Sequence, residues 1–297
     1  MEKLSLLLFS NSEFLILLCF TFVILIIGYF LYQLYYFKSE KHRSILSLVL
    51  MMLIYTVISF WKLGSTSFPT TTWQPTAEKQ QITFDFGKSE KFDAIYTIYG
   101  EGDTNSNPST YQIGTNNIHL YASNDLQEWT RIASLEQGNI YTYAIEQGNW
   151  QYRYIKLVDL SENSSLSEIG FRNENHTGFL PISILRDKQK DGPYPGSLLI
   201  DEQDKLVLSP TYYDQAYFDE IYHVRNAWEI ANGQYMYANV HPLLGTNIIA
   251  LSIRLFGMNP FAWRLPGAIA GVLMLPVLFG ILKLLLKRDE LSLIGSF

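Results

Sequence analysis

Long apolar runs near both ends of the chain enclose a middle part in which apolar and polar residues alternate. No residue from Phe14 to Phe37 is charged, and two further apolar runs cover Ile45–Trp61 and Leu265–Leu282. A helix rises about 1.5 Å per residue, so the first run is long enough to span a hydrocarbon core of roughly 30 Å. The pattern predicts three membrane-spanning helices, of which the first two form a hairpin over residues 1–64 and the third covers residues 263–288.

The first run is longer than the apolar core of a cleaved signal peptide, the alternative interpretation, and no small-x-small site follows it. The loop KSEKHR at 38–43 is basic, and Lys283, Lys287 and Arg288 follow the third span. Basic loops stay on the cytoplasmic side. The sequence therefore predicts an integral membrane protein, with the N-terminus and residues 63–262 extracytoplasmic.

Short alternating segments fill residues 65–180. They are QITFDF at 81–86, FDAIYTIYG at 92–100, NIHLYAS at 117–123, WTRIASL at 129–135, YTYAI at 141–145 and YRYIKLV at 152–158. A period of two, broken by turn residues, is typical of an all-β sandwich. Residues 181–216 are rich in Pro, Gly and charge, which predicts a linker.

Two segments of this β domain, YASNDLQEWTRI and YRYIKLVDLSENSSLSEIGF, resemble discoidin-type jelly rolls. The resemblance implies that Trp129, Tyr154 and Ile169 are core residues. It implies glycans as ligands only through the analogy of fold. No metal-ligand spacing is recognisable, so no metal is expected.

Composition excludes some functions. The net charge is −6 and the pI is about 5.4, so the chain has no basic field for a nucleic-acid partner. The single cysteine, Cys19, can form no disulfide within the chain.

The stretch 217–264 carries the candidate chemistry. One apolar stripe at helical spacing consists of Tyr217, Ile221, Val224, Trp228 and Ala231, and Gly233 follows. The opposite, polar face carries Asp219, Glu220, His223 and Arg225. This pattern alone also fits a plain amphipathic helix at a membrane interface, with acids placed at its positive end.

Three segments of this region resemble the protein O-mannosyltransferases, membrane glycosyltransferases of the GT-C class: YFDE at 217–220, HPLLG at 241–245 and LFGMNPFAWRLPG at 255–267. The resemblance implies an incomplete GT-C-like α-helical membrane protein of a bacterial cell membrane, with an inserted β domain. It also implies inverting transfer of mannose from polyprenyl-phosphate-mannose to Ser or Thr hydroxyls of a protein acceptor, on the extracytoplasmic face. No cofactor is expected besides this lipid-linked donor.

The resemblance assigns roles to individual residues. Asp219 is the expected base for the attacking hydroxyl, and Arg264 offsets charge on the departing phosphate. Glu220 positions the acceptor or orients Arg264. The expected substrate-binding residues are His223, Arg225 and His241. The alternative for His223 and Arg225 is a polar helix face in contact with solvent, and the alternative for His241 is that it shapes the loop together with Pro242.

The chain departs from the family pattern in two places. Leu243 and Thr246 stand where the family has Pro and Lys, and members carry many more spans than three. The tail 289–297 begins a further apolar segment. We therefore expect an N-terminal part of such an enzyme, or one half of a split enzyme whose downstream chain supplies the missing spans. The alternatives are a non-catalytic membrane-anchored carbohydrate-binding module and an ancillary subunit of a complete transferase.

Overall fold

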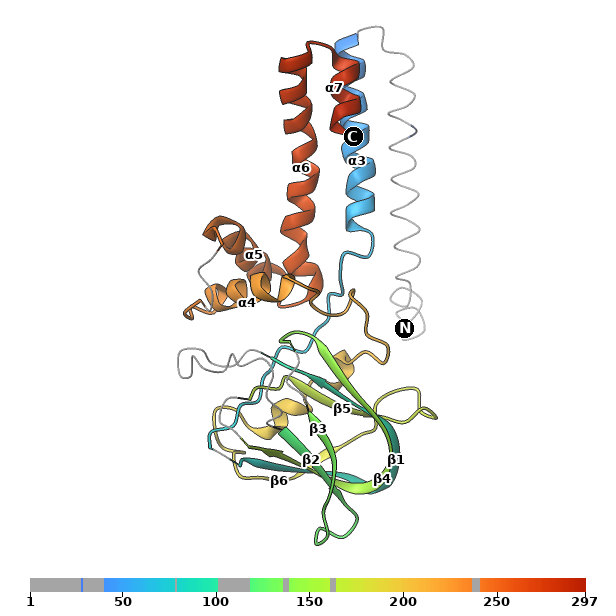
Figure 1. Cartoon of the computed structure of the whole chain (residues 1–297), viewed down its shortest axis with the longest axis vertical. Coiled ribbons are helices and arrows are strands. Elements are labelled where there is room, and N and C mark those ends of the chain that lie inside the picture. The colour runs from blue at the N-terminus through green and yellow to red at the C-terminus, as the bar shows by residue number, and fades with distance from the viewer. Residues whose placement is uncertain are drawn as a thin grey trace, which may run out of the picture. The chain divides into compact units, whose positions relative to one another are not determined.

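The computed structural model describes Gly28 and residues 40–77, 79–100, 118–135, 139–160, 164–236 and 241–297. The chain divides into two compact units, one made of residues 1–62 and 267–297 and the other of residues 63–266. Figure 1 shows the elements of both. Of the predicted span Phe14–Phe37, Gly28 alone belongs to the described residues, so this span stays a prediction.

The first unit contains the helices α3 (Glu40–Phe60), most of α6 (Pro260–Leu286) and α7 (Asp289–Ser296). Two helical segments, His42–Phe60 and Pro260–Leu286, are long and apolar enough to cross a membrane. They correspond to the second and third predicted spans. The helices α3 and α6 approach closely where Gly271 lies against the Tyr55 ring, because a glycine leaves room for it.

The second unit contains an antiparallel sheet with the strand order β3-β2-β4-β1-β5, and β6 also pairs with β1. The strands are β1 (Gln81–Ile98), β2 (Ile118–Ser123), β3 (Thr130–Leu135), β4 (Tyr143–Asp159), β5 (Glu168–Arg172) and β6 (Ser183–Asp187). The prediction of a β domain in this part of the chain is confirmed.

Two pairs of predicted strands are each one long strand. The segments 81–86 and 92–100 belong to β1, and the segments 141–145 and 152–158 belong mostly to β4. The register between β1 and β4 shifts between Asp85 and Glu90, around Gly87 at a φ of 80°. A bulge with a left-handed glycine bends a strand without ending it. The sequence pattern therefore placed a turn where the strand only bends.

The core of the sheet is aromatic. Phe86 and Phe92 both pack edge-to-face against Phe171, with ring centroids 5.2 and 5.4 Å from that of Phe171. Edge-to-face contacts of this kind add to the stabilisation from burial. Ile169 is fully buried in this core, as predicted. Trp129 and Tyr154 are not core residues, because both are half-buried. Trp129 immediately precedes β3, and Tyr154 alternates along β4 with the fully buried Ile155, so it lies on the outer face of the sheet.

Residues 181–216 are not a linker. They contain β6 and two short 3-10 helices, Gly196–Leu199 and Gln203–Lys205. Leu199 is fully buried in the core of the sheet. Pro and Gly correctly marked irregular backbone here, but composition did not reveal that this backbone packs on the sheet.

The helices α4 (Glu220–Ala231) and α5 (Leu243–Phe256) lie side by side in the second unit. Val224 from α4, Ile253 from α5 and Trp263 from the start of α6 share a buried cluster with Phe68 and Tyr141. This cluster joins the helices to residues that flank the sheet. The helices and the sheet therefore form one packed unit, in which the sheet can position α4.

One buried acid makes the stability of this unit depend on pH. Glu168 is fully buried and accepts hydrogen bonds from the Gln203 side chain and from the Glu202 backbone N–H. Burial raises the pKa of Glu168 from 4.5 to about 8, although these hydrogen bonds oppose the shift. Between these values the folded chain holds a proton that the unfolded chain releases. The contribution of Glu168 to stability is therefore largest below about pH 4.5 and is lost as the pH rises through about 8.

We expect Glu168→Gln to flatten this dependence, because an amide stays neutral. Thermal unfolding of the full chain across the window tests this expectation. The exposed Glu174 supplies the control variant Glu174→Gln, which should keep the wild-type slope. An undiminished slope in Glu168→Gln would contradict the assignment.

Candidate functional site

Asp219 lies at the start of α4 with its carboxylate uncommitted. It is the N-cap residue of the helix but makes no side-chain capping bond, and it is exposed. The preceding Phe218 has a φ of 50°, a left-handed conformation that costs a non-glycine residue roughly 1–2 kcal/mol. This turn holds the chain away from the ordinary helical path just before the acid. The local backbone therefore presents Asp219 to the surface.

A cavity of about 390 Å³ opens beside Asp219. Its lining comes from the approach to β4 and from the start of α4: Asn139, Thr142, Tyr143, Gln215, Ala216, Tyr217, Phe218, Asp219, Ile221 and Tyr222. Among these described lining residues, Asp219 carries the only carboxylate. Burial raises the pKa of Tyr143 to about 12, so its phenol keeps its proton at neutral pH. Asp219 is thus the lining group best suited to accept a proton.

Glu220 and Arg264 form a bidentate ion pair next to this acid. Arg264 Nε and Nη2 donate to the two Glu220 carboxylate oxygens, both at 2.7 Å, across 44 residues of sequence. The side chain of Arg264 is 12% exposed and that of Glu220 is 31% exposed. Bidentate pairs of this kind combine strength with a fixed geometry. The pair holds the first turn of α4 against the start of α6.

Arg264 also forms hydrogen bonds to two loop segments. Its Nη1 donates to the Leu63 carbonyl at 3.1 Å, and its Nη2 donates to the Gln215 carbonyl at 3.0 Å. Four of the five guanidinium N–H groups are therefore engaged within the described residues, which leaves one at Nη1. This geometry fits the expectation that Glu220 orients Arg264. Arg264 mainly holds the surrounding segments in place, and a single N–H group is left that could bind a phosphate.

Gln215 connects this pair to the sheet. Its side-chain carbonyl accepts a hydrogen bond from the Tyr143 backbone N–H at 2.7 Å, and Ala216 N–H donates to the Tyr141 carbonyl at 3.0 Å. The contacts thus run from Arg264 through Gln215 to the first residue of β4. Leu63, Gln215 and Tyr143 were not predicted from the sequence. Leu63 and Gln215 contact Arg264 through backbone carbonyls and Tyr143 contacts Gln215 through its backbone N–H, and such groups carry no residue-specific signal.

Gly64 permits the close approach of these segments. A Cβ at this position would lie 2.6 and 2.7 Å from backbone atoms of Pro260 and Phe261. We expect Gly64→Ala to separate the segments, to detach the Leu63 carbonyl from Arg264 and to cost about 1–3 kcal/mol, the range for overpacking. Unfolding of the full chain measures this loss. Gly245→Ala is the control, because nothing lies within 4 Å of its Cβ position, and equal stability of both variants would contradict the expectation.

His223 and His241 come together, with ring centroids 4.7 Å apart. His223 is half-buried on α4, one turn after Asp219, and His241 is exposed just before α5. The structure therefore places two of the three expected substrate-binding residues beside each other. His223 comes four residues after Asp219, so these two side chains lie on the same side of the start of α4.

The expectation that Arg225 lies on a solvated polar face is wrong. Its side chain is 6% exposed and pairs with the fully buried Glu229, one turn further along α4, at 3.3 Å. A buried acid requires such a partner, because an unpaired charge in the interior is costly. Arg225 therefore stabilises the helix and is not offered to a substrate at the surface. Tyr217 also departs from its predicted place in the apolar stripe, since it precedes the helix and is exposed.

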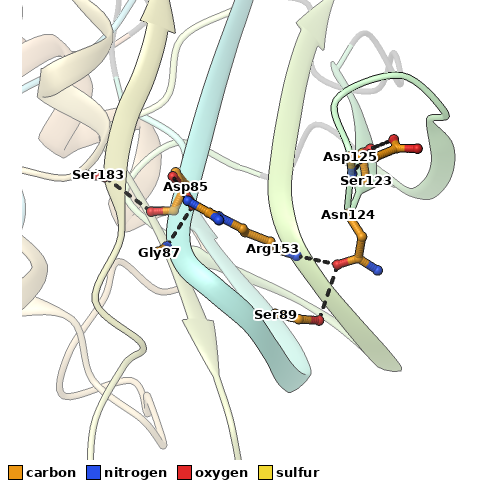
Figure 2. Close-up of polar contacts among 8 residues, drawn as sticks. All are labelled: Asp85, Gly87, Ser89, Ser123, Asn124, Asp125, Arg153 and Ser183. Atoms are coloured by element: carbon orange, nitrogen blue, oxygen red, sulfur yellow. Dashed lines mark hydrogen bonds and ion pairs between the residues drawn. The ribbon is translucent and has the colours of Figure 1, made fainter.

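A separate polar cluster lies where β1 bends and β2 ends (Figure 2). Arg153 forms a bidentate pair with Asp85 at 2.9 and 3.1 Å, and its backbone N–H donates to the Asn124 side chain. The Arg153 guanidinium is the main cause that holds the pKa of Asp85 below its ordinary value. Asp85 also accepts from the Gly87 N–H at 2.7 Å. These groups satisfy one another and fix the bulge of β1, so this cluster is structural.

The neighbouring turn uses its polar residues in the same way. Asp125 Oδ1 accepts hydrogen bonds from the backbone N–H groups of Gln127 and Glu128 and from the Ser123 hydroxyl. These bonds lower the pKa of Asp125. The Ser-x-Asp segment therefore closes the turn between β2 and β3.

Aromatic side chains gather on the outer face of the sheet. Lys156 lies 4.1 Å from the Trp129 ring centroid and 5.5 Å from that of Tyr121. All three side chains are half-buried. Desolvation lowers the pKa of Lys156. This face combines flat apolar rings with a cation in contact with them.

Comparisons with known proteins match only parts of the chain. No family model matches the chain. The polyprenol-phosphate-mannose–protein mannosyltransferase of Mycobacterium tuberculosis is 33% identical over 85 residues, which are 27% of this chain and 16% of that protein. The protein of the same name from Mycolicibacterium smegmatis is 32% identical over 94 residues, 30% of this chain and 18% of that protein.

Solved structures are similar over about a third of the chain. The structure titled CpGH89CBM32-6, produced by Clostridium perfringens, is 23% identical with a TM-score of 0.27 and covers 38% of this chain and 82% of its own. The lectin domain of lectinolysin complexed with Lewis B antigen is 16% identical with a TM-score of 0.29, over 38% and 86%. The chain is thus similar in part to polyprenol-phosphate-mannose–protein mannosyltransferases, and it spans less than a fifth of the length of these relatives.

Proposed function

We propose that this chain forms the acceptor side of a membrane glycosyltransferase that transfers mannose from polyprenyl-phosphate-mannose to Ser or Thr hydroxyls of proteins. The observation that carries the proposal is the placement of Asp219. An uncommitted carboxylate lines an open cavity, and the Glu220–Arg264 pair fixes the turn that presents it. The partial similarity to mannosyltransferases supports this class of reaction.

In the proposed reaction, Asp219 accepts the proton of the acceptor hydroxyl. The hydroxyl oxygen forms a bond to the anomeric carbon while the bond from that carbon to the phosphate oxygen breaks, which inverts the anomeric configuration. The electron pair of the broken bond leaves with polyprenyl phosphate. A phosphate is a good leaving group, so the base on the hydroxyl is the main assistance that the protein supplies.

Arg264 contributes to this reaction chiefly by positioning. Its charge is balanced by Glu220, and one N–H at Nη1 remains for a phosphate oxygen. His223 and His241 contact the donor or the acceptor from the same end of α4. We place this site on the extracytoplasmic face, as the positive-inside pattern predicts. The exposed apolar stripe of α5 at Leu244, Ile248, Leu251 and Leu255 suits a position at the membrane surface.

Transfer of labelled mannose tests the proposal. The full-length protein in its native membranes receives polyprenyl-phosphate-mannose labelled in the sugar and a Ser/Thr peptide, with the matched Ala peptide as control. We expect label on the Ser/Thr peptide alone. Label on neither peptide, or on both equally, would contradict the proposal.

The second candidate is non-catalytic carbohydrate binding by the sheet, and the aromatic outer face favours it. The rings of Tyr121 and Trp129 are flat, half-exposed surfaces of the kind on which sugar rings stack. Binding of glycans to the full chain that is lost in Trp129→Ala, without any mannose transfer by the full-length protein, would favour this candidate over the first.

A further inference from the structure

A cavity of about 670 Å³ lies within the first unit, where α3 begins, α6 ends and α7 begins. Its lining contains the four cationic residues Arg43, Lys283, Lys287 and Arg288 and the two acidic residues Asp289 and Glu290. Four positive charges less two negative charges leave a net charge of +2. The cavity therefore favours an anion.

The charges inside this cavity are not equally available. Lys283 and Asp289 neutralise each other, with Nζ 2.9 Å from Oδ1 and 3.0 Å from Oδ2, and the Ser44 hydroxyl also hydrogen-bonds Asp289. Lys287 and Arg288 are both exposed, and neither makes an ion pair or side-chain hydrogen bond with any residue in the described ranges. These two cations are the groups left to meet an anion.

The backbone holds the two cations at the cavity. Lys287 has a φ of 54°, a left-handed conformation that turns the chain sharply between α6 and α7. Arg288 is the N-cap residue of α7. The chain thus places two adjacent cations in a tight turn between two helices, where their side chains border one cavity.

An apolar surface adjoins the cations. The last turn of α6 exposes Leu284 by 80%, Leu285 by 72% and Leu286 by 44%, and Leu293 of α7 lines the cavity itself. Inorganic phosphate or a nucleotide would leave this apolar surface in water. A phospholipid offers both parts, a phosphate for the cations and acyl chains for the leucines.

We propose that this cavity binds an anionic phospholipid, with its phosphate against Lys287 and Arg288 and its acyl chains along Leu284 to Leu286. The helices α3 and α6 are both apolar enough to cross a membrane, and the cavity lies at one end of each, at the level where headgroups are found. The positive-inside pattern assigns this end to the cytoplasmic leaflet. The proposal does not rest on the proposed transferase activity.

The test is a titration of the full chain, in a neutral detergent, with phosphatidylglycerol that carries a fluorophore on an acyl chain. Anisotropy gives the Kd, and phosphatidylcholine with the same label measures binding that does not depend on charge. We expect the double variant Lys287→Gln/Arg288→Gln to weaken phosphatidylglycerol binding by about 5-fold for each charge removed, roughly 30-fold in all. The control is Lys188→Gln/Lys190→Gln, which removes two exposed cations of the second unit and should leave the Kd unchanged.

Equal binding of the two lipids by the wild-type chain would overturn the proposal, and so would an unchanged Kd in the Lys287/Arg288 variant. Displacement of the labelled lipid by inorganic phosphate, but not by unlabelled phosphatidylglycerol, would show a site for a soluble anion and overturn the lipid assignment. The single variants Lys287→Gln and Arg288→Gln, each with an intermediate Kd, would support it without relying on the double change.

Discussion

Asparagine in place of Asp219 is expected to lower the kcat of mannose transfer by about 10²–10⁴-fold, the usual contribution of a general base. The amide keeps the shape of the carboxylate but does not accept the proton of the acceptor hydroxyl. The KM for the acceptor should change little, because the lost interaction acts on the proton in the transition state. Steady-state transfer by the full-length protein in native membranes measures both constants.

The control for this change is Asp204→Asn, which neutralises an exposed acid elsewhere in the same unit. It should leave kcat and KM at their wild-type values. An Asp219→Asn enzyme with wild-type kcat would remove Asp219 from the reaction. A large rise in KM at constant kcat would instead make it a binding residue.

Loss of either partner of the Glu220–Arg264 pair is expected to destabilise the second unit by about 2 kcal/mol, because it leaves the other charge largely buried and unpaired. Breaking a fully buried pair costs more, but the side chain of Glu220 is 31% exposed. Arg264→Met should cost more than Glu220→Gln, since it also removes the bonds to the Leu63 and Gln215 carbonyls.

A double-mutant cycle of these changes, read from unfolding of the full chain, isolates the pairwise energy. The double variant should cost less than the sum of the single variants. Hydrogen exchange at residues 217–222 should speed up in each variant. Arg186→Met, which removes an exposed arginine of β6, is the control and should change neither observable. Strict additivity would show that the pair does not act as a unit.

The sequence predicted the elements of this site better than their contacts. Asp219, Glu220 and Arg264 stand out because their segments resemble one enzyme family, and helical spacing places the two acids near the start of α4. The pairing of Glu220 with Arg264 crosses 44 residues, a separation at which no periodicity operates. Such a contact follows only from the packing of α4, α5 and the start of α6 in one cluster.

Predictions from local sequence patterns were wrong where a residue or strand contacts a buried or distant partner. Arg225 was predicted to be solvated because charged residues usually are, but it is buried in an ion pair with the buried Glu229. The segment that includes β6 looked like a linker because its Pro and Gly residues favour turns, but pairing with β1 is a long-range property that composition does not encode. Arg254 of α5 donates to the Ile230 and Ala231 carbonyls at the end of α4, another contact across more than 20 residues that local spacing does not indicate.

The most direct test of the account is where the acceptor hydroxyl binds. A peptide with a photoreactive group next to its Ser is irradiated with the full-length protein in native membranes, and mass spectrometry locates the crosslinks. We expect them at residues 139–143 and 215–222, around the cavity beside Asp219, and equally in Asp219→Asn, which removes the base but not the cavity. Crosslinks confined to the outer face of the sheet, or to neither region, would contradict the assignment of this cavity to the acceptor.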